Sequence, residues 1–182
     1  MSTTPSLDND LLLPLLKKIG RTYGKKQAEP LKLFAKKYFA STANTELARF
    51  TEEELFVSVN DAWELIQQRK GSAPKIEFIH RKLDKDAKRQ TGTSVYLLLD
   101  DMPFLIDSVR QSLNRAGVVI RSINNAVIQV ERSTKNGKNK GRLQNISVGK
   151  QDGFKAEALS CINCAHINEQ QAKLVDEALT LK

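Results

Sequence analysis

Residues 97–120 read LLLDDMPFLIDSVRQSLNRAGVVI, and this stretch decides the fold. The apolar run that ends here is typical of a strand covered on both faces. Pro103 has no amide hydrogen and a preset φ, so a helix is expected to begin there. Gly117 suits the end of that helix, where a positive φ is common, and a second strand follows it. Apolar residues at helical spacing form the inner face of the helix: Leu105, Ile106, Val109, Leu113 and Ala116.

The first seventy residues predict helices. A short apolar helix is expected near Pro14, and a second helix is expected to have Pro30 in its first turn. Thr51 and Glu54 have the spacing of a capping box, which begins a third helix. Gly71 and Pro74 bound that helix on its C-terminal side. Its apolar stripe consists of Leu55, Val59, Ala62 and Ile66, widened by Phe56 and Trp63, and Trp63 is expected to be a packing residue.

After Pro74 the spacing of the apolar residues changes from a helical pattern to a strand pattern. Four strands are predicted. The first two cover 75–79 and 94–99, and the last covers 156–167. The third covers 118–123 and 126–130 and is expected to bend at Asn124-Asn125. Residues 81–89 predict a charged turn and residues 135–150 a solvated hairpin loop. A final helix over 169–181 is expected to turn Leu174, Ala178 and Leu181 inward.

The order of elements is therefore helices followed by β-β-α-β-β-α. This order predicts an α+β fold, in which a helical subdomain (1–73) precedes a ferredoxin-like antiparallel sheet with helices on one face (74–182). A ferredoxin-like sheet usually receives a last strand after its last helix. Here the early strand near 76–79 is expected to take that edge position.

Composition sets limits on function. The 182 residues carry a formal net charge of +8, but the lysines are scattered and few aromatic residues lie among them, so solvated surface is favoured over nucleic-acid contact. No apolar run approaches the roughly 20 residues of a membrane span, and the start of the chain does not resemble a signal peptide, so a cytoplasmic protein is expected. Two cysteines do not indicate a disulfide framework.

The acid-proline junction is the candidate site. An aspartate before Pro103 can cap the first amides of the helix, which stabilises it by roughly 0.5–2 kcal/mol. The same amides at the end of a strand can hold a small anion, with a neighbouring aspartate binding an ammonium group. The residues alone leave both interpretations open. The candidate effector-binding residues are Asp100, Asp101, Met102, Pro103 and Phe104.

Other patterns do not indicate chemistry. Cys161 and Cys164 form a CxxC motif, but in a strand residues three apart face opposite sides, and there is no second cysteine pair. Free thiols are therefore expected, with no metal site. Ser160, Cys161 and His166 do not have the spacing of a recognisable nucleophile and base. No G-x-G-x-x-G follows a strand, so neither catalytic residues nor a cofactor site are expected in this chain.

The junction also carries a resemblance. DDMPFLIDSV followed by SLNRAGVVI resembles the N-terminal ACT-like region of the large bacterial NAD-dependent glutamate dehydrogenases. The likeness extends back through YFASTANTELARFTEEELFVSVNDAWELIQQRKGSAPKIEF and forward through AVIQVERS, so that it covers about residues 30–182. Many ACT domains have glycine after this proline. Phe104 stands there instead, and is expected to crowd a ligand or turn into the core.

The resemblance implies a non-catalytic regulatory or oligomerisation region of a longer enzyme. The parent enzyme would deaminate L-glutamate oxidatively to 2-oxoglutarate and use NAD, which would bind outside this region. Implied partners are other domains of the parent chain, a second copy in a homo-oligomer, and an amino-acid effector. A stand-alone amino-acid-binding ACT module is the alternative function, and a basic nucleic-acid-binding domain is a further, less favoured one.

Overall fold

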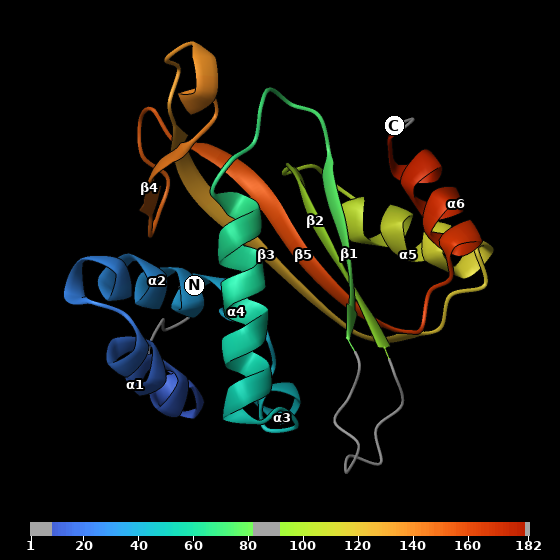
Figure 1. Cartoon of the computed structure of the whole chain (residues 1–182), viewed down its shortest axis with the longest axis horizontal. Coiled ribbons are helices and arrows are strands. Elements are labelled where there is room, and N and C mark those ends of the chain that lie inside the picture. The colour runs from blue at the N-terminus through green and yellow to red at the C-terminus, as the bar shows by residue number, and fades with distance from the viewer. Residues whose placement is uncertain (1–8, 82–91, 181–182) are drawn as a thin grey trace, which may run out of the picture.

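The computed structural model describes residues 9–81 and 92–180, which form one antiparallel sheet with helices on both faces (Figure 1). The helices are α1 (Leu13–Thr22), α2 (Lys25–Tyr38), α3 (Asn44–Leu47), α4 (Glu52–Ile66), α5 (Leu105–Arg115) and α6 (Glu169–Thr180), with short 3₁₀ turns at Asp10–Leu12 and Gly137–Asn139. The strands are β1 (Lys75–Arg81), β2 (Gly92–Asp100), β3 (Ile120–Arg132), β4 (Leu143–Ser147) and β5 (Lys155–Ala165).

The strand order is β1-β2-β5-β3-β4, and every neighbouring pair is antiparallel. The expected α+β, ferredoxin-like arrangement is present, and it is formed by β2, β3 and β5 together with α5 and α6. β1 lies at the edge beside β2, as predicted from the early position of this strand in the chain. The fold class inferred from the order of elements is therefore confirmed.

α5 and α6 cover one face of the sheet. Each of these helices buries two aliphatic side chains against the sheet: Val109 and Leu113 from α5, and Val175 and Leu179 from α6. They pack in one cluster with side chains of the strands, among them Val95, Leu97, Ile162 and Cys164. The prediction that Leu174 points inward is wrong, because this side chain is 49% exposed. The inward stripe of α6 runs through Val175 and Leu179 instead, four residues apart. Leu181 lies outside the described residues.

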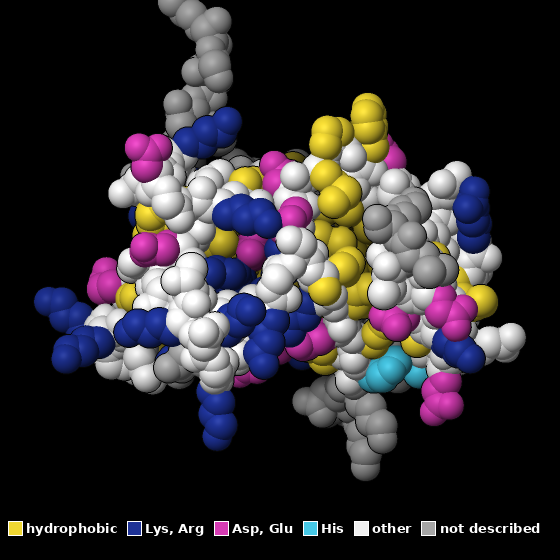
Figure 2. Space-filling view, turned by 90° about the horizontal axis from the view of Figure 1, so that it is seen from above, with side chains coloured by type: hydrophobic (Ala, Val, Ile, Leu, Met, Phe, Trp, Pro, Cys, Tyr) yellow, Lys and Arg dark blue, Asp and Glu magenta, His cyan; other side chains and the backbone are white. Residues whose placement is uncertain are grey.

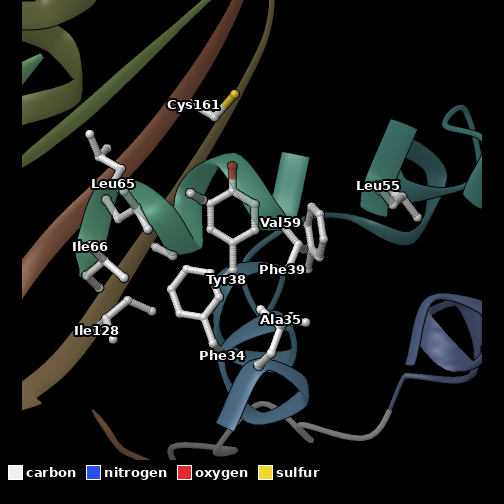
Figure 3. Close-up of a cluster of buried hydrophobic side chains, with 14 of the residues drawn as sticks. Phe34, Ala35, Tyr38, Phe39, Leu55, Val59, Leu65, Ile66, Ile128 and Cys161 are labelled. Carbon is white, nitrogen blue, oxygen red and sulfur yellow. The ribbon is translucent and has the colours of Figure 1, made fainter. Parts of the chain in front are cut away.

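The N-terminal helices cover the other face, which we call the lead-in face. Figure 3 shows Phe34 and Tyr38 of α2 packed beside α4, with the Tyr38 hydroxyl directed toward Cys161 of β5. The ring of Trp63 lies 5.1 Å from that of Phe34, which confirms it as a packing residue. The strands contribute Tyr96, Leu98, Ile128 and Leu159 to the same core.

Two predicted features of the N-terminal helices have different outcomes. The capping box is present, because the Glu54 amide donates to Thr51 Oγ1 and the Thr51 amide donates to Glu54 Oε2. The placement of Pro30 in a first helical turn is wrong, since α2 begins at Lys25 and includes Pro30 in its interior. The lack of an amide hydrogen at Pro30 is tolerated because the residues on both sides of it bury an apolar stripe.

The third strand also differs from the prediction. β3 continues through Asn124 and Asn125, both of which remain paired with β5, and the irregularity lies at Arg121, between Ile120 and Ser122. This extra residue places Ser122 and Asn124 on the lead-in face. The loop expected over 135–150 contains the edge strand β4. The turn expected over 81–89 falls largely outside the described residues, and the division at residue 73 stays a prediction.

Candidate functional site

Asp100 lies at the end of β2 and takes part in ion pairs inside the fold. Its Oδ1 accepts from Arg69 Nη1 at 2.7 Å and its Oδ2 accepts from Lys155 Nζ at 2.8 Å. Burial raises the pKa of Asp100, but the hydrogen bonds from Lys155 and Arg69 outweigh it and leave the pKa below its ordinary value. Asp100 therefore joins the end of β2 to the segment after α4 and to β5.

Arg69 and Glu157 form the centre of this cluster, and both side chains are 2% exposed. Arg69 Nη1 lies 3.3 Å from Glu157 Oε1, and the rest of its guanidinium donates to the carbonyls of Ser72 and Ala73. Arg132 donates to both oxygens of Glu157, at 2.8 and 2.7 Å. We call Arg69, Asp100, Arg132, Lys155 and Glu157 the ion cluster.

Sequence reasoning did not identify the ion cluster. Two signals were available: Glu157 interrupts an otherwise apolar strand (AEALSCI), and Arg69 closes the Q-Q-R end of the α4 segment. A charge at a buried strand position requires a partner, because an unpaired buried charge costs several kcal/mol. The identity of that partner depends on the tertiary fold, so the pattern alone could not supply it.

The other candidate residues lie outside this cluster. Asp101, Met102, Pro103 and Phe104 are all exposed, and α5 begins only at Leu105. The prediction that the helix begins at Pro103 is therefore wrong by two residues. The prediction of an aspartate cap is also wrong, because the N-cap position is Phe104 and it makes no side-chain capping bond. Asp100 is held by cations in the ion cluster, away from the amides of α5.

Phe104 neither crowds the junction nor turns into the core. Its side chain is 79% exposed and its backbone is left-handed, with φ 59° and ψ 15°. Phenylalanine adopts this conformation at a cost of about 1–2 kcal/mol, whereas glycine adopts it freely. The backbone thus has a conformation that favours glycine while its side chain points to solvent. The five predicted effector-binding residues are consecutive, but Asp100 faces inward and the rest face outward.

The cysteines have the predicted disposition. Both are free and buried, Cys161 in the core under the lead-in helices and Cys164 in the core under α5 and α6. Burial raises the pKa of both thiols, so neither has the character of a reactive thiolate. Across residues 9–81 and 92–180, no group of three His, Cys, Asp or Glu side chains could hold a metal ion. In the same part of the chain, no helix is long and apolar enough to cross a bilayer.

Comparison with known proteins identifies the family. The family described as glutamate dehydrogenase, ACT1 domain, matches residues 34–179. The NAD-specific glutamate dehydrogenase of Halomonas elongata is 32% identical over 138 residues, which are 76% of this chain and 8% of that protein. The NAD-specific glutamate dehydrogenase of Pseudomonas aeruginosa is 32% identical over 152 residues, which are 82% of this chain and 9% of that protein.

The chain thus spans less than a tenth of the length of these two relatives. No solved structure matches it significantly. The family match covers the C-terminal end of α2, the lead-in helices α3 and α4, the whole sheet and nearly all of α6. The chain belongs to the ACT1 domain family of glutamate dehydrogenases.

Proposed function

We propose that this chain is a non-catalytic domain of an NAD-specific glutamate dehydrogenase and that it holds other parts of that enzyme together. The parent enzyme would convert L-glutamate to 2-oxoglutarate with reduction of NAD, and NAD would bind outside this domain. The names of both relatives support the parent activity. The contacts made by this domain would join it to other domains of its chain or to a second subunit, and would also transmit regulation.

The observation that carries the proposal is the exposed apolar segment at the head of α5. Met102 is 49% exposed and Phe104 is 79% exposed, and the half-buried Leu105 and Ile106 follow directly. We call residues 102–106 the apolar knob. Figure 2 shows one face of the molecule, on which hydrophobic side chains gather in a strip beside a region rich in lysine and arginine. Exposed apolar clusters of this kind mark protein contact sites.

The backbone of the apolar knob adds to this argument. Phe104 has left-handed φ and ψ, which disfavour any side chain, and yet its ring contributes little to the core of this chain. A conformation that lowers stability without improving internal packing is typical of a residue that acts on a partner. Asp100, the other half of the predicted effector site, is occupied by Arg69 and Lys155. Contact through the apolar knob is therefore favoured over an amino-acid effector at the junction.

The test is the replacement Phe104→Ser in the full-length enzyme. We expect the enzyme to lose its oligomeric state or its interdomain packing, because a central aromatic anchor commonly carries 2 kcal/mol or more of a contact, at an order-of-magnitude estimate. Sedimentation velocity measures the assembly, and limited proteolysis measures the accessibility of domain junctions. Circular dichroism of the isolated domain checks that its fold is unchanged.

Val119→Ser is the matched control. Val119 is 64% exposed and lies just before β3, at the opposite end of α5 from Phe104. This change also removes an exposed apolar side chain, so it reports the general effect of such a loss. An assembly that tolerates Phe104→Ser as well as it tolerates Val119→Ser would contradict the assembly role.

A further inference from the structure

A second feature lies on the lead-in face, at the end of the sheet away from the ion cluster. A cleft of about 1000 Å³ opens there between the α3–α4 region and the strands, and we call it the polar cleft. Phe50, Leu55 and Ser58 line its helical side. Ser94 of β2, Asn163 of β5 and Ser122 of β3 line its floor. Its volume lies at the upper end of the range usual for small-molecule sites.

The cleft exists because the side chains on this part of the sheet are short and polar. Further along the same face, Tyr96, Leu98 and Leu159 fill the space under α2 and α4. At the polar end, the shorter side chains of Ser94, Ser122 and Asn163 take the corresponding positions, and their hydrogen bonds run along the sheet. The extra residue at Arg121 contributes to this, since it places Ser122 beside Asn163.

The floor is a row of hydrogen bonds that runs across three strands. Ser94 Oγ donates to Asn163 Oδ1 at 2.8 Å, and Asn163 Nδ2 donates to Ser122 Oγ at 3.0 Å. These bonds fix the asparagine amide in one orientation. An asparagine amide has two N–H donors and a serine hydroxyl has one, so Asn163 and Ser122 keep donor capacity toward the cleft.

Two guanidinium groups flank the same floor. Arg81 pairs with Gly92 across the β1–β2 ladder, and its guanidinium forms an ion pair with Asp61 of α4. Arg121 reaches over the same glycine: a Cβ on Gly92 would lie 3.3 Å from Arg121 Nη1 and 3.0 Å from the carbonyl oxygen of Cys164. The absence of a side chain at Gly92 therefore leaves space for the guanidinium at the edge of the floor.

The acids of the lining are partly engaged elsewhere. Glu53 is bonded to Lys18 of α1, and Glu54 caps its own helix through Thr51. Glu46 of α3 remains as an acceptor on the helical side of the cleft. The cleft thus presents cations and neutral donors on the sheet side and an acceptor opposite them.

We propose that the polar cleft binds a small organic acid that carries a carboxylate and a hydroxyl on a short chain. Its carboxylate lies against Arg121 and Arg81, since guanidinium forks match carboxylate geometry. Its remaining oxygens accept from Asn163 and Ser122, and its hydroxyl donates to Glu46. The proposal does not depend on the assembly role of the apolar knob, because this site lies on the opposite face of the sheet and belongs to the chain itself.

The test is calorimetric titration of this chain with L-malate. We expect one saturable site, and no saturable heat with malamide, the neutral diamide of the same shape. Arg121→Gln and Asn163→Leu should each weaken binding about tenfold or more, because each removes hydrogen bonds to a charged group. The control Arg110→Gln, on the exposed face of α5, should leave the affinity unchanged.

Three results would overturn the proposal: no saturable heat with L-malate, an affinity that both cleft variants leave unchanged, or equal binding of inorganic phosphate, which would indicate a general anion site. Amide NMR shifts on the unaltered chain provide a second measurement in case a variant does not fold. L-Malate should shift Gly92, Ser122 and Asn163 and leave the α5 amides in place; shifts confined to other residues would also overturn it.

Discussion

Replacing Glu157 by glutamine tests whether the ion cluster fastens the lead-in helices to the sheet. Glu157 is buried on β5, where Arg132 donates to both of its oxygens and Arg69 lies 3.3 Å away. Arg132 also donates to the carbonyl of Ile66, the last residue of α4. Glu157→Gln keeps the shape of the side chain and removes its charge, so it isolates the electrostatic contribution.

The expected loss is large because both arginines stay buried. A glutamine can accept a hydrogen bond through its oxygen, but its amide nitrogen would face a guanidinium nitrogen, and two donors do not bond. At an effective dielectric constant of about 20, each charge pair at 4 Å is worth roughly 4 kcal/mol before desolvation is subtracted. Removal of one member of a buried pair typically costs about 3–5 kcal/mol, and we expect a decrease of that size in the free energy of unfolding.

Urea unfolding of the chain at neutral pH, followed by circular dichroism, measures this change. The control is Glu177→Gln on α6, where the carboxylate is 55% exposed and lies 3.9 Å from Lys173. Exposed pairs of this kind contribute less than about 0.5 kcal/mol. If Glu157→Gln costs less than about 1 kcal/mol, or no more than Glu177→Gln, the ion cluster does not hold the two layers together.

Three further outcomes follow from single residues. Gly141→Ala should lower the free energy of unfolding by more than about 2 kcal/mol, measured in urea, since φ is +76° and a Cβ would lie 1.9 Å from the Arg69 carbonyl oxygen. Burial raises the pKa of Asp100, but its lysine and arginine partners outweigh burial and lower the pKa below its ordinary value of 3.8. The charged carboxylate therefore stabilises the fold above about pH 3.8, and this stability is lost as the pH falls through the lowered pKa of the folded state. Asp100→Asn should therefore flatten the acid side of a thermal-melting profile taken from about pH 6 to about pH 3. In urea, Phe104→Gly should be at least as stable as the original chain, because glycine adopts the left-handed conformation without strain. Phe104→Ala should show no such gain in the free energy of unfolding, because alanine keeps the Cβ that causes the strain.

The sequence predicted the elements whose signals are local. The apolar period before and after the acid-proline junction, the capping box at Thr51 and the positive φ at Gly117 depend on neighbours in the chain, and all of them are confirmed. The class of fold follows from the order of these elements, so it was also accessible. Pro30 was misplaced because burial of an apolar stripe outweighed a local preference.

The features that define the candidate sites depend on contacts between distant segments. Asp100 meets Arg69 and Lys155, which lie 31 and 55 residues away, and no spacing rule predicts such a pairing. The polar cleft likewise requires the irregularity at Arg121, which changes the side of the sheet that Ser122 faces. A shift of one residue in a strand reverses the exposure of every later side chain, and no glycine stands next to Arg121 to mark the shift.

The two ends of β2 connect the two proposals. Asp100, at one end, leads directly into the apolar knob, and Gly92, at the other, lies under Arg121 in the polar cleft. β2 is hydrogen-bonded to neighbours on both sides, to β1 and to β5, and almost all of its side chains are buried. If both proposals hold, a ligand that tightened the cleft against β2 and β5 would also restrict the segment that follows Asp100, because β2 is paired along its length with the sheet. An effector in the cleft would then act on assembly through one strand, without occupying the junction where the sequence places the site.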